Sequence, residues 1–291
     1  MKSKKRQNKK QRHAIKRKQR KKQLSRKKQL KQGSKQTLNH PNNIVGYGNA
    51  DLSKYEGMLA ATTTGEHFQP VRLHYTVPDT KRLIAIFDRL KCIDYDKSQK
   101  RWVWLLSDEA KDLKFKKLPP EFDDEQVIII GEFLIKDKQE VVLNLRSHER
   151  ALIAIEFFDQ HIPRDVAKLT DMTTINRLFN IPEMANLVPL DNVFNKYQLT
   201  VTDPDKMIKD MEAIAERASN QMESITMLND YLAKREKQPE PIMEKRPLYF
   251  YEDGISSIKL QLKIHHIVSM KHWTGNTDYT TMDAIREMSV E

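Results

Sequence analysis

The residues with the clearest chemical meaning are the lysines and arginines of the first 36 positions. Residues 1–36, hereafter the basic arm, carry 18 Lys or Arg and no Asp or Glu. A polymer of regularly spaced phosphates attracts such a segment through counterion release, whatever its base sequence. No aromatic side chain is interleaved, so the basic arm is expected to hold the backbone without stacking on bases. The expected phosphate-contacting residues are Lys4, Lys5, Arg6, Lys9, Lys10, Arg17, Lys18, Arg20, Lys21, Lys22, Arg26, Lys27 and Lys28.

The rest of the chain, residues 37–291, has the opposite charge. This body holds the remaining 33 of the 51 basic residues and all 40 acidic residues, a net charge of −7, although the whole chain carries +11. An acidic body repels a polyanion weakly, so attraction must come from the basic arm or from a local patch. Alternatives for the arm are a nuclear localisation signal, a mitochondrial transit peptide, contact with an anionic membrane surface, or no function.

Some carboxylates of the body could hold a catalytic metal. Asp79 follows a proline, and Glu109 precedes Lys111 by two positions, a pattern similar to that of restriction-type nucleases, in which carboxylates hold Mg²⁺. However, Asp79 is expected to cap a helix and Glu109 to follow a strand, so the two need not converge. Convergence of these two with Asp94 and Asp96 would indicate a nuclease-like, metal-dependent enzyme. Separation would favour a non-enzymatic protein.

Other residue types give weaker signals of chemistry. Imidazoles suit zinc or iron, but an expected strand near the C-terminus would place His265 and His266 on opposite faces, and His272 lies beyond it. Cys92 is the only cysteine, which excludes an internal disulfide and multi-cysteine zinc sites, and no histidine lies near it in the sequence. No glycine-rich phosphate loop occurs. No cofactor or metal is therefore expected.

Two tryptophans lie two positions apart in one expected strand. Trp102 and Trp104 therefore share a face of the sheet. Exposed aromatics on a sheet can stack bases, but two tryptophans in this spacing more commonly face a core. We expect them to be core residues.

The expected elements define an α+β fold with a mixed sheet and packed helices. The basic arm is too polar to order when free and should be disordered, and residues 37–66 are expected to be a linker. Residues 67–170 are expected to form an α+β domain of order β-α-β-β-β-α. Its expected elements are strands at 71–77, 102–106, 126–135 and 140–146 and helices at 80–90 and 148–161, capped by Asp79 and Ser147.

Residues 171–291 are expected to be richer in helix. A short helix should begin after Asp171, a long helix should span 204–234, and residues 247–269 should form a C-terminal β-hairpin. A coiled coil is one alternative for the long helix, but its apolar stripe is wide, so packing inside the protein is favoured. The heptad seam consists of Met207, Met211, Ile214, Ala218, Gln221, Ile225, Leu228 and Leu232.

These observations predict an intracellular protein of the cytoplasm, nucleoid or nucleus, since no apolar stretch is long enough for a membrane span or a secretory signal. The predicted function is non-enzymatic association with DNA or RNA, with the arm contacting phosphates independently of sequence. The acidic body would then serve as an interaction domain, with a protein as its possible partner. The alternative is a nucleic-acid-modifying enzyme, nuclease-like and metal-dependent, tethered by the arm.

Overall fold

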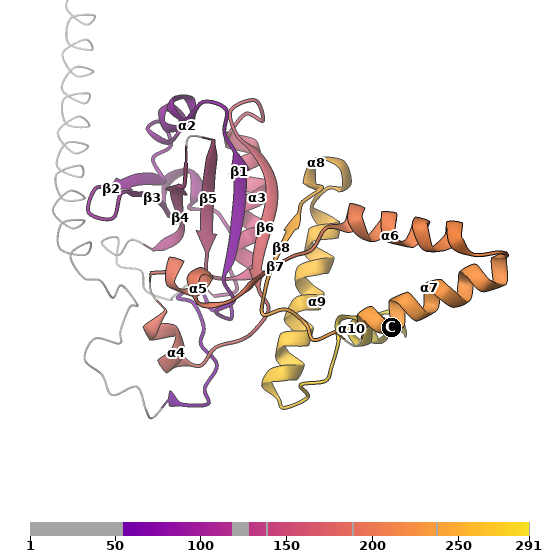
Figure 1. The fold of residues 1–291 in the computed structure, drawn as a ribbon. Coiled ribbons are helices and arrows are strands. Elements are labelled where there is room, and N and C mark those ends of the chain that lie inside the picture. The colour runs from indigo at the N-terminus through magenta and orange to yellow at the C-terminus, as the bar shows by residue number, and fades with distance from the viewer. Residues whose placement is uncertain (1–54, 118–127, 138, 188, 237, 291) are drawn as a thin grey trace, which may run out of the picture. The chain divides into compact units, whose positions relative to one another are not determined.

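The computed structural model describes residues 55–117, 128–137, 139–187, 189–236 and 238–290 (Figure 1). These residues belong to one compact unit, Tyr47–Glu291. The basic arm, with every residue predicted to contact phosphate, lies outside the described residues. Among the described residues, no helix is both long enough and apolar enough to cross a membrane.

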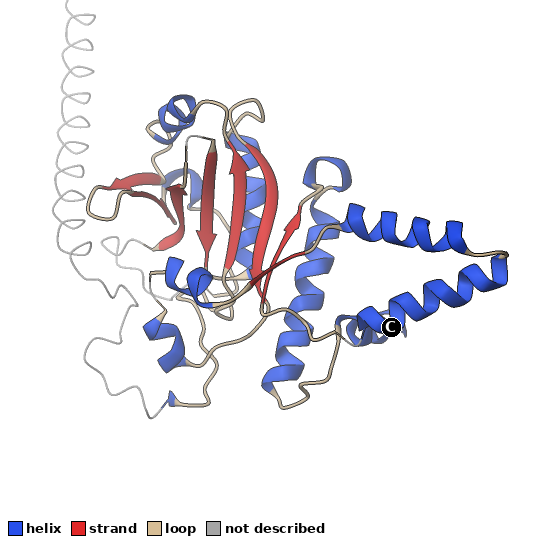
Figure 2. Cartoon of the chain, in the orientation of Figure 1, coloured by secondary structure: helices blue, strands red, loops and turns tan. Residues whose placement is uncertain are grey.

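The described chain builds a mixed sheet of eight strands with helices beside it, which confirms the expected α+β class (Figure 2). The strand order is β2-β3-β4-β5-β1-β6-β8-β7. All neighbours are antiparallel except β7 and β8, which are parallel. The strands are β1 Val71–Thr76, β2 Ile93–Asp96, β3 Arg101–Leu105, β4 Ile129–Ile135, β5 Glu140–Leu145, β6 Lys168–Ile175, β7 Leu199–Val201 and β8 Met243–Pro247.

The helices begin where the sequence offers capping side chains. Asp79 accepts a hydrogen bond from Lys81 N at 2.9 Å, and Ser147 accepts one from Arg150 N at 3.1 Å, as expected from the sequence. The α-helices are α2 Thr80–Phe87, α3 His148–His161, α4 Ile181–Asn186, α5 Asp191–Lys196, α6 Pro204–Arg217, α7 Gln221–Glu236, α8 Phe250–Asp253, α9 Ile255–Trp273 and α10 Thr281–Val290. A 3-10 turn spans Asp108–Ala110.

One face of the sheet forms the main hydrophobic core. Side chains of Leu73, Leu143 and Trp104 on this face are fully buried, together with residues of α2, α3 and α9. Figure 1 shows α3 behind the sheet, and it contacts β1, β5 and α9. Gly131 leaves room for this packing, because a Cβ there would lie 3.0 Å from Leu143 Cδ1 and 3.1 Å from Trp104 Cε3.

The tryptophan prediction is confirmed. Trp104 has no exposed surface and packs on Phe158, with ring centroids 4.8 Å apart. Trp102 packs on Phe87 and Tyr95. Trp104 is therefore a core residue, and Trp102 is partly buried against the same core.

Residues 55–66, which the sequence assigned to a linker, join the folded body, and residues 37–54 of the expected linker lie outside the described residues. Leu59 forms a β-bridge with Asn180. The Thr-rich run folds over Glu66, which is fully buried and accepts a hydrogen bond from Thr64 Oγ1 at 2.6 Å. Arg150 lies beside it, with Nε 3.6 Å from Glu66 Oε2. The Thr-rich composition of this segment is typical of a turn. Arg150, which is distant in the sequence, pairs with the Glu66 carboxylate and makes it part of the core.

The short helix expected after Asp171 is also wrong, because these residues lie within β6. β6 pairs with β1 on one side and β8 on the other, and both neighbours supply backbone hydrogen bonds. A register shift makes Leu169 and Asp171 face successive residues of β1. This bulge lets Leu169 and Met172 both face the core although they are three positions apart, a spacing that imitates a helix. The expected domain boundary at residue 170 therefore falls inside a strand, and strands on both sides of it share one sheet.

The C-terminal hairpin expected at 247–269 is wrong as well. Most of this segment is the 19-residue helix α9. Its buried residues include Ile258, Leu262, His265 and Ser269, which recur at steps of four, three and four, whereas Leu260 is half exposed. The apolar residues of this segment fit a period of two and a period of 3.6 equally well, and packing against α3 selects the helix.

The long helix expected at 204–234 is two helices, α6 and α7, joined by a turn (Figure 1). Asn220 Oδ1 accepts from Glu223 N at 3.0 Å, and Glu223 Oε2 accepts from Ser219 N at 2.8 Å. The first bond satisfies a backbone N–H group in the first turn of α7, and the second ties the preceding residue Ser219 to that turn, so Ser-Asn starts a new helix instead of continuing α6. α6 and α7 contact each other within the chain, although no residue of α6 is fully buried.

Candidate functional site

The second face of the sheet carries charged and polar side chains, hereafter the polar face. Cross-strand pairing places Thr173, Arg72, Asn144 and Glu132 in one continuous row across β6, β1, β5 and β4. Side chains alternate along a strand, so these residues all lie opposite the hydrophobic core. The row brings together groups that are distant in the sequence, which is the usual origin of a functional site.

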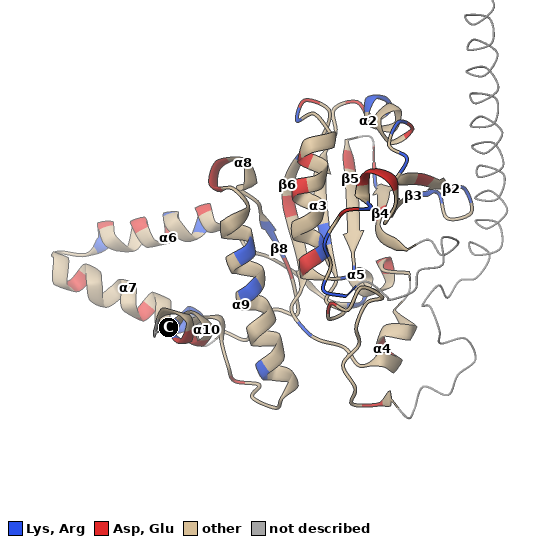
Figure 3. Ribbon diagram, turned by 180° about the vertical axis from the view of Figure 1, so that it is seen from behind, with Lys and Arg blue, Asp and Glu red and all other residues tan. Residues whose placement is uncertain are grey.

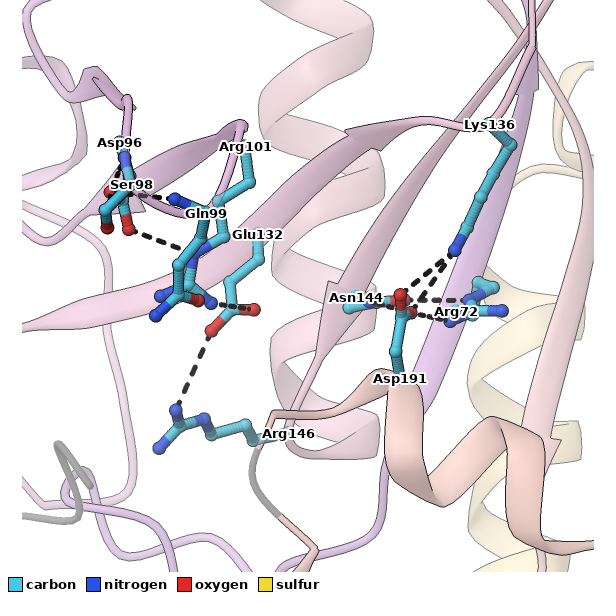
Figure 4. Close-up of polar contacts among 10 residues, drawn as sticks. All are labelled: Arg72, Asp96, Ser98, Gln99, Arg101, Glu132, Lys136, Asn144, Arg146 and Asp191. Carbon is cyan, nitrogen blue, oxygen red and sulfur yellow. Dashed lines mark hydrogen bonds and ion pairs between the residues drawn. The ribbon is translucent and has the colours of Figure 1, made fainter. Parts of the chain in front are cut away.

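The first cluster on the polar face surrounds Asp191, at the start of α5 (Figure 4). Arg72 forms an ion pair with this carboxylate, and Lys136 Nζ donates to Asp191 Oδ2 at 3.1 Å. Asn144 Nδ2 donates to Asp191 Oδ1 at 3.2 Å, and Asn144 Oδ1 accepts from Arg72 Nε at 2.8 Å. The guanidinium also lies 4.1 Å from the ring centroid of Phe194. This cluster fastens α5 to the sheet.

The electrostatics of this cluster make its carboxylate a weak base. Burial would raise the pKa of Asp191, but the hydrogen bond from Lys136 and the charge of Arg72 outweigh it and lower the pKa. Burial lowers the pKa of Arg72, and Asp191 opposes that shift. A carboxylate stabilised as an anion binds cations well and accepts protons poorly, so Asp191 is suited to holding α5 and not to general base catalysis near neutral pH.

The second cluster links β2, β3 and β4 through alternating charges (Figure 4). Arg101 Nε lies 3.4 Å from Asp96 Oδ2, and Arg101 Nη1 lies 2.5 Å from Glu132 Oε2. Arg146 Nη2 is 3.8 Å from the other oxygen of Glu132. Asp96 also accepts from the Ser98 hydroxyl at 2.6 Å. Two arginines and two carboxylates therefore neutralise one another, which is how buried charges persist in a fold.

A histidine continues the polar face on β1. His74 Nδ1 lies 2.9 Å from Glu140 Oε1, and Nε2 lies 2.9 Å from Thr173 Oγ1. Burial lowers the pKa of His74, while the hydrogen bond to Glu140 acts in the opposite direction. Both ring nitrogens have partners, so His74 cross-links three strands.

The four carboxylates considered as metal ligands have separate structural roles. Asp79 caps α2, and Glu109 Oε2 accepts from Cys92 N at 3.0 Å. Asp94 accepts from the backbone of the next residue, and Asp96 belongs to the cluster around Arg101. In the part of the chain that the structure describes, no group of three or more His, Cys, Asp or Glu residues is arranged to hold a metal ion. The geometry gives no support to a nuclease-like centre within these residues.

The three C-terminal histidines all lie on α9. His265 is buried, and burial, followed by the charge of Arg246, lowers its pKa to about 3. His266 Nδ1 lies 2.9 Å from Gln69 Oε1, and His272 Nε2 lies 2.7 Å from Tyr279 O. His265 Nε2 lies 3.8 Å from Glu244 Oε2, so the helix directs the three imidazoles to different partners.

Cys92 is a buried thiol. Burial, followed by the charge of Glu109, raises its pKa to about 12. A thiol that stays protonated is a poor nucleophile. Its packing in the core accounts for its presence.

Sequence reasoning missed the residues that build the polar face. Glu132 and Asn144 are polar positions within otherwise apolar strands, and that interruption was the available signal. The pairing of β4 with β5 places them opposite each other, and Arg72 follows in the next strand. Only the strand order could bring the three together.

The arginines of the body are largely committed to carboxylates of the same chain. Figure 3 shows acidic and basic residues together on α6, whereas α9 carries basic residues without acidic ones. Paired cations attract phosphate weakly, since a nucleic acid must compete with the internal carboxylate. The ion pairs are Arg72–Asp191, Arg82–Asp165, Arg101–Glu132, Arg146–Glu132, Arg150–Glu66, Arg164–Asp159, Arg177–Glu183, Arg246–Glu244 and Arg286–Asp283.

The fold and the polar face define an α+β protein with a mixed eight-stranded sheet in its described part, carrying a self-neutralised charged face. Comparison with known protein-family models, curated proteins and solved structures found no match.

Proposed function

We propose that this chain is a non-enzymatic nucleic-acid-associated protein. Its basic arm contacts the phosphate backbone without regard to base sequence, and its acidic body acts as an interaction domain. The observation that carries the proposal is the segregation of charge, with 18 Lys or Arg and no acidic residue in residues 1–36 against a net charge of −7 in the rest. Counterion release makes such a segment a phosphate ligand.

The ion pairs within the body support the assignment of phosphate binding to the arm. The arginines of the polar face already contact Asp96, Glu132 or Asp191, so they offer little free positive charge. A body of net negative charge also disfavours a polyanion at longer range. Binding is therefore assigned to the arm.

The salt dependence of binding tests the proposal. Fluorescence anisotropy with labelled duplex and single strands should show affinity falling by about 10³ to 10⁵ between 50 and 200 mM salt if the arm makes roughly 6 to 10 phosphate contacts. Changing Lys21, Lys22, Lys27 and Lys28 to Gln should reduce the log-log slope, each by less than about one unit. The relative affinities for different sequences should stay the same, since backbone contacts do not read bases.

A matched control removes the same charge from the body. Lys97, Lys114, Lys259 and Lys263 are exposed, and their combined change to Gln should leave the slope nearly unchanged. Salt-insensitive binding, or an equal loss of slope in the control, would contradict the proposal and move the nucleic-acid site to the folded body.

A further inference from the structure

The hairpin of α6 and α7 exposes apolar side chains that folded helices normally bury. Exposed fractions are 51% for Ile208, 73% for Met222, 47% for Ile225 and 44% for Leu232. Helices of this length are marginal in water, because most helical stability comes from packing an apolar face. Such a concentration of exposed apolar residues on one element marks an interaction surface.

The helices α6 and α7 contact each other, each through one line of half-buried residues, hereafter its internal stripe. On α6 the half-buried apolar residues include Met207 and Ile214, and on α7 they include Leu228 and Tyr231. Tyr231 Oη lies 3.4 Å from Asp210 Oδ2, which fixes the middle of α6 beside the C-terminal half of α7. The hairpin is thus an antiparallel pair, and its exposed apolar residues lie outside the internal contact.

The exposed residues lie on one side of the hairpin. At about 100° per residue, Ile208 and Ala215 are about a quarter turn from the internal stripe of α6. Ile225 and Leu232 are about a quarter turn from the internal stripe of α7, and Met222 is about 0.4 of a turn from it, in the same rotational sense. Because the helices run in opposite directions, equal rotational senses lead to the same side. These five residues are the outer apolar surface.

The opposite side of the hairpin is charged. The same geometry places Lys206 and Arg217 of α6 with Glu223 and Asp230 of α7 on that side, and all four are exposed. One side of the hairpin is therefore suited to solvent and the other to a protein partner.

We propose that the outer apolar surface binds the same surface of a second copy of this chain, so that two hairpins form a four-helix bundle around a two-fold axis. Met222, Ile225, Asn229 and Leu232 follow heptad spacing on α7, with one asparagine among apolar residues. A two-fold axis near Asn229 places its amide beside that of the partner copy. An amide has both a donor and an acceptor, so two copies satisfy each other.

The two ends of the surface fit each other under this symmetry. Ile208 and Leu232 lie at the base of the hairpin, and Met222 and Ile225 lie at its tip beside the small Ala215. A two-fold axis near Asn229 places the base of one hairpin against the tip of the other. The large apolar side chains at each end then contact apolar surface of the partner copy. A two-fold interface needs this self-complementarity, because each half must fit a copy of itself.

The area is sufficient for a weak dimer. Helices of 14 and 16 residues are about 21 and 24 Å long, and two adjacent helices are about 20 Å wide. The projected contact is then roughly 400 to 500 Å² for each copy, at the low end of specific interfaces. We expect a dissociation constant in the micromolar range. A dimer would also present two basic arms to one polymer, although the dimer itself does not depend on what the arms bind.

Sedimentation velocity of the full chain, from about 1 to about 100 µM, tests the dimer. The expected result is a concentration-dependent shift from monomer to dimer. Ile225→Lys should weaken the dimer at least about tenfold, since it buries a charge at the interface. Leu260→Lys is the matched control, because Leu260 is equally exposed on α9, and it should leave the dimer unchanged. Circular dichroism and melting temperature verify that both variants fold.

A cysteine at the two-fold axis gives an independent readout. Cys92 is buried, so in Asn229→Cys the new thiol is the accessible one among the described residues and should form a disulfide-linked dimer under mild oxidation. Asp230→Cys, on the charged side of the same helix, should not cross-link. A monomer at every concentration, equal cross-linking of both variants, or a dimer lost in Leu260→Lys and kept in Ile225→Lys would overturn the proposal and assign the surface to another partner.

Discussion

The sheet with its packed helices and the α6–α7 hairpin satisfy the same physical requirements in different ways. In the sheet, apolar residues such as Leu143 are fully buried, and charges such as Glu132 meet partners within the chain. In the hairpin, Met222 and Ile225 face solvent while Asp230 and Lys206 are exposed on the other side. The centre of the sheet finds its partners within the chain, whereas the hairpin keeps a surface that another molecule can cover.

This difference separates two kinds of substitution. A change inside the sheet should alter the free energy of unfolding of the isolated chain. A change on the outer apolar surface should alter association and leave that free energy nearly constant.

Glu66→Ala should destabilise the protein by about 3 to 5 kcal/mol, because it leaves Arg150 charged and buried without its carboxylate. Burial already lowers the pKa of Arg150 to about 10, with Glu66 opposing the shift. Urea denaturation would measure the loss. The control is Glu183→Ala, which breaks the partly exposed pair with Arg177 and removes a capping bond, and should cost about 1 to 2 kcal/mol. An equal loss of unfolding free energy in both variants would contradict a larger contribution of the buried Glu66–Arg150 pair.

Acid should destabilise the sheet through its buried histidines. Burial, together with neighbouring His265 and His266, lowers the pKa of His148 to about 3, and burial lowers that of His265 to about 3. The unfolded chain binds protons at these groups near pH 6.5, and the folded chain does not. Their contribution to stability is therefore complete above about pH 6.5 and is lost progressively as the pH falls toward 3.

Denaturation at a series of pH values from 8 to 4 measures this effect, with a slope of about 1.4 kcal/mol per pH unit for each imidazole between those pKa values. The double variant His148→Gln and His265→Gln should have a flatter profile than the original chain. An unchanged profile would show that other groups control acid stability.

Met222→Ser should have the smallest effect on folding. Its side chain is 73% exposed, so the free energy of unfolding measured at low protein concentration should change by less than about 0.5 kcal/mol. The same variant should weaken association in sedimentation experiments. A loss of 2 kcal/mol or more in the dilute monomer would mean that Met222 packs within its own chain.

The sequence by itself determined the features that depend on neighbouring residues. The alternation at Val71, Leu73 and Tyr75 predicted β1, and Asp79 and Ser147 predicted the starts of α2 and α3. Charge segregation also separated the arm from the body. The predictions of these elements agree with the structure because alternation and capping depend on residues close together in the sequence.

The tertiary structure alone decided what depends on distant partners. The segment after Asp171 is a strand because β1 and β8 pair with it on both sides, and α9 is a helix because its buried stripe packs beside α3. The polar face arises only when β1, β4 and β5 become neighbours. Some hydrophobic patterns fit both a helix and a strand, and some contacts join residues far apart in the sequence. In both cases the chain adopts the arrangement that buries the most apolar surface and pairs the most polar groups.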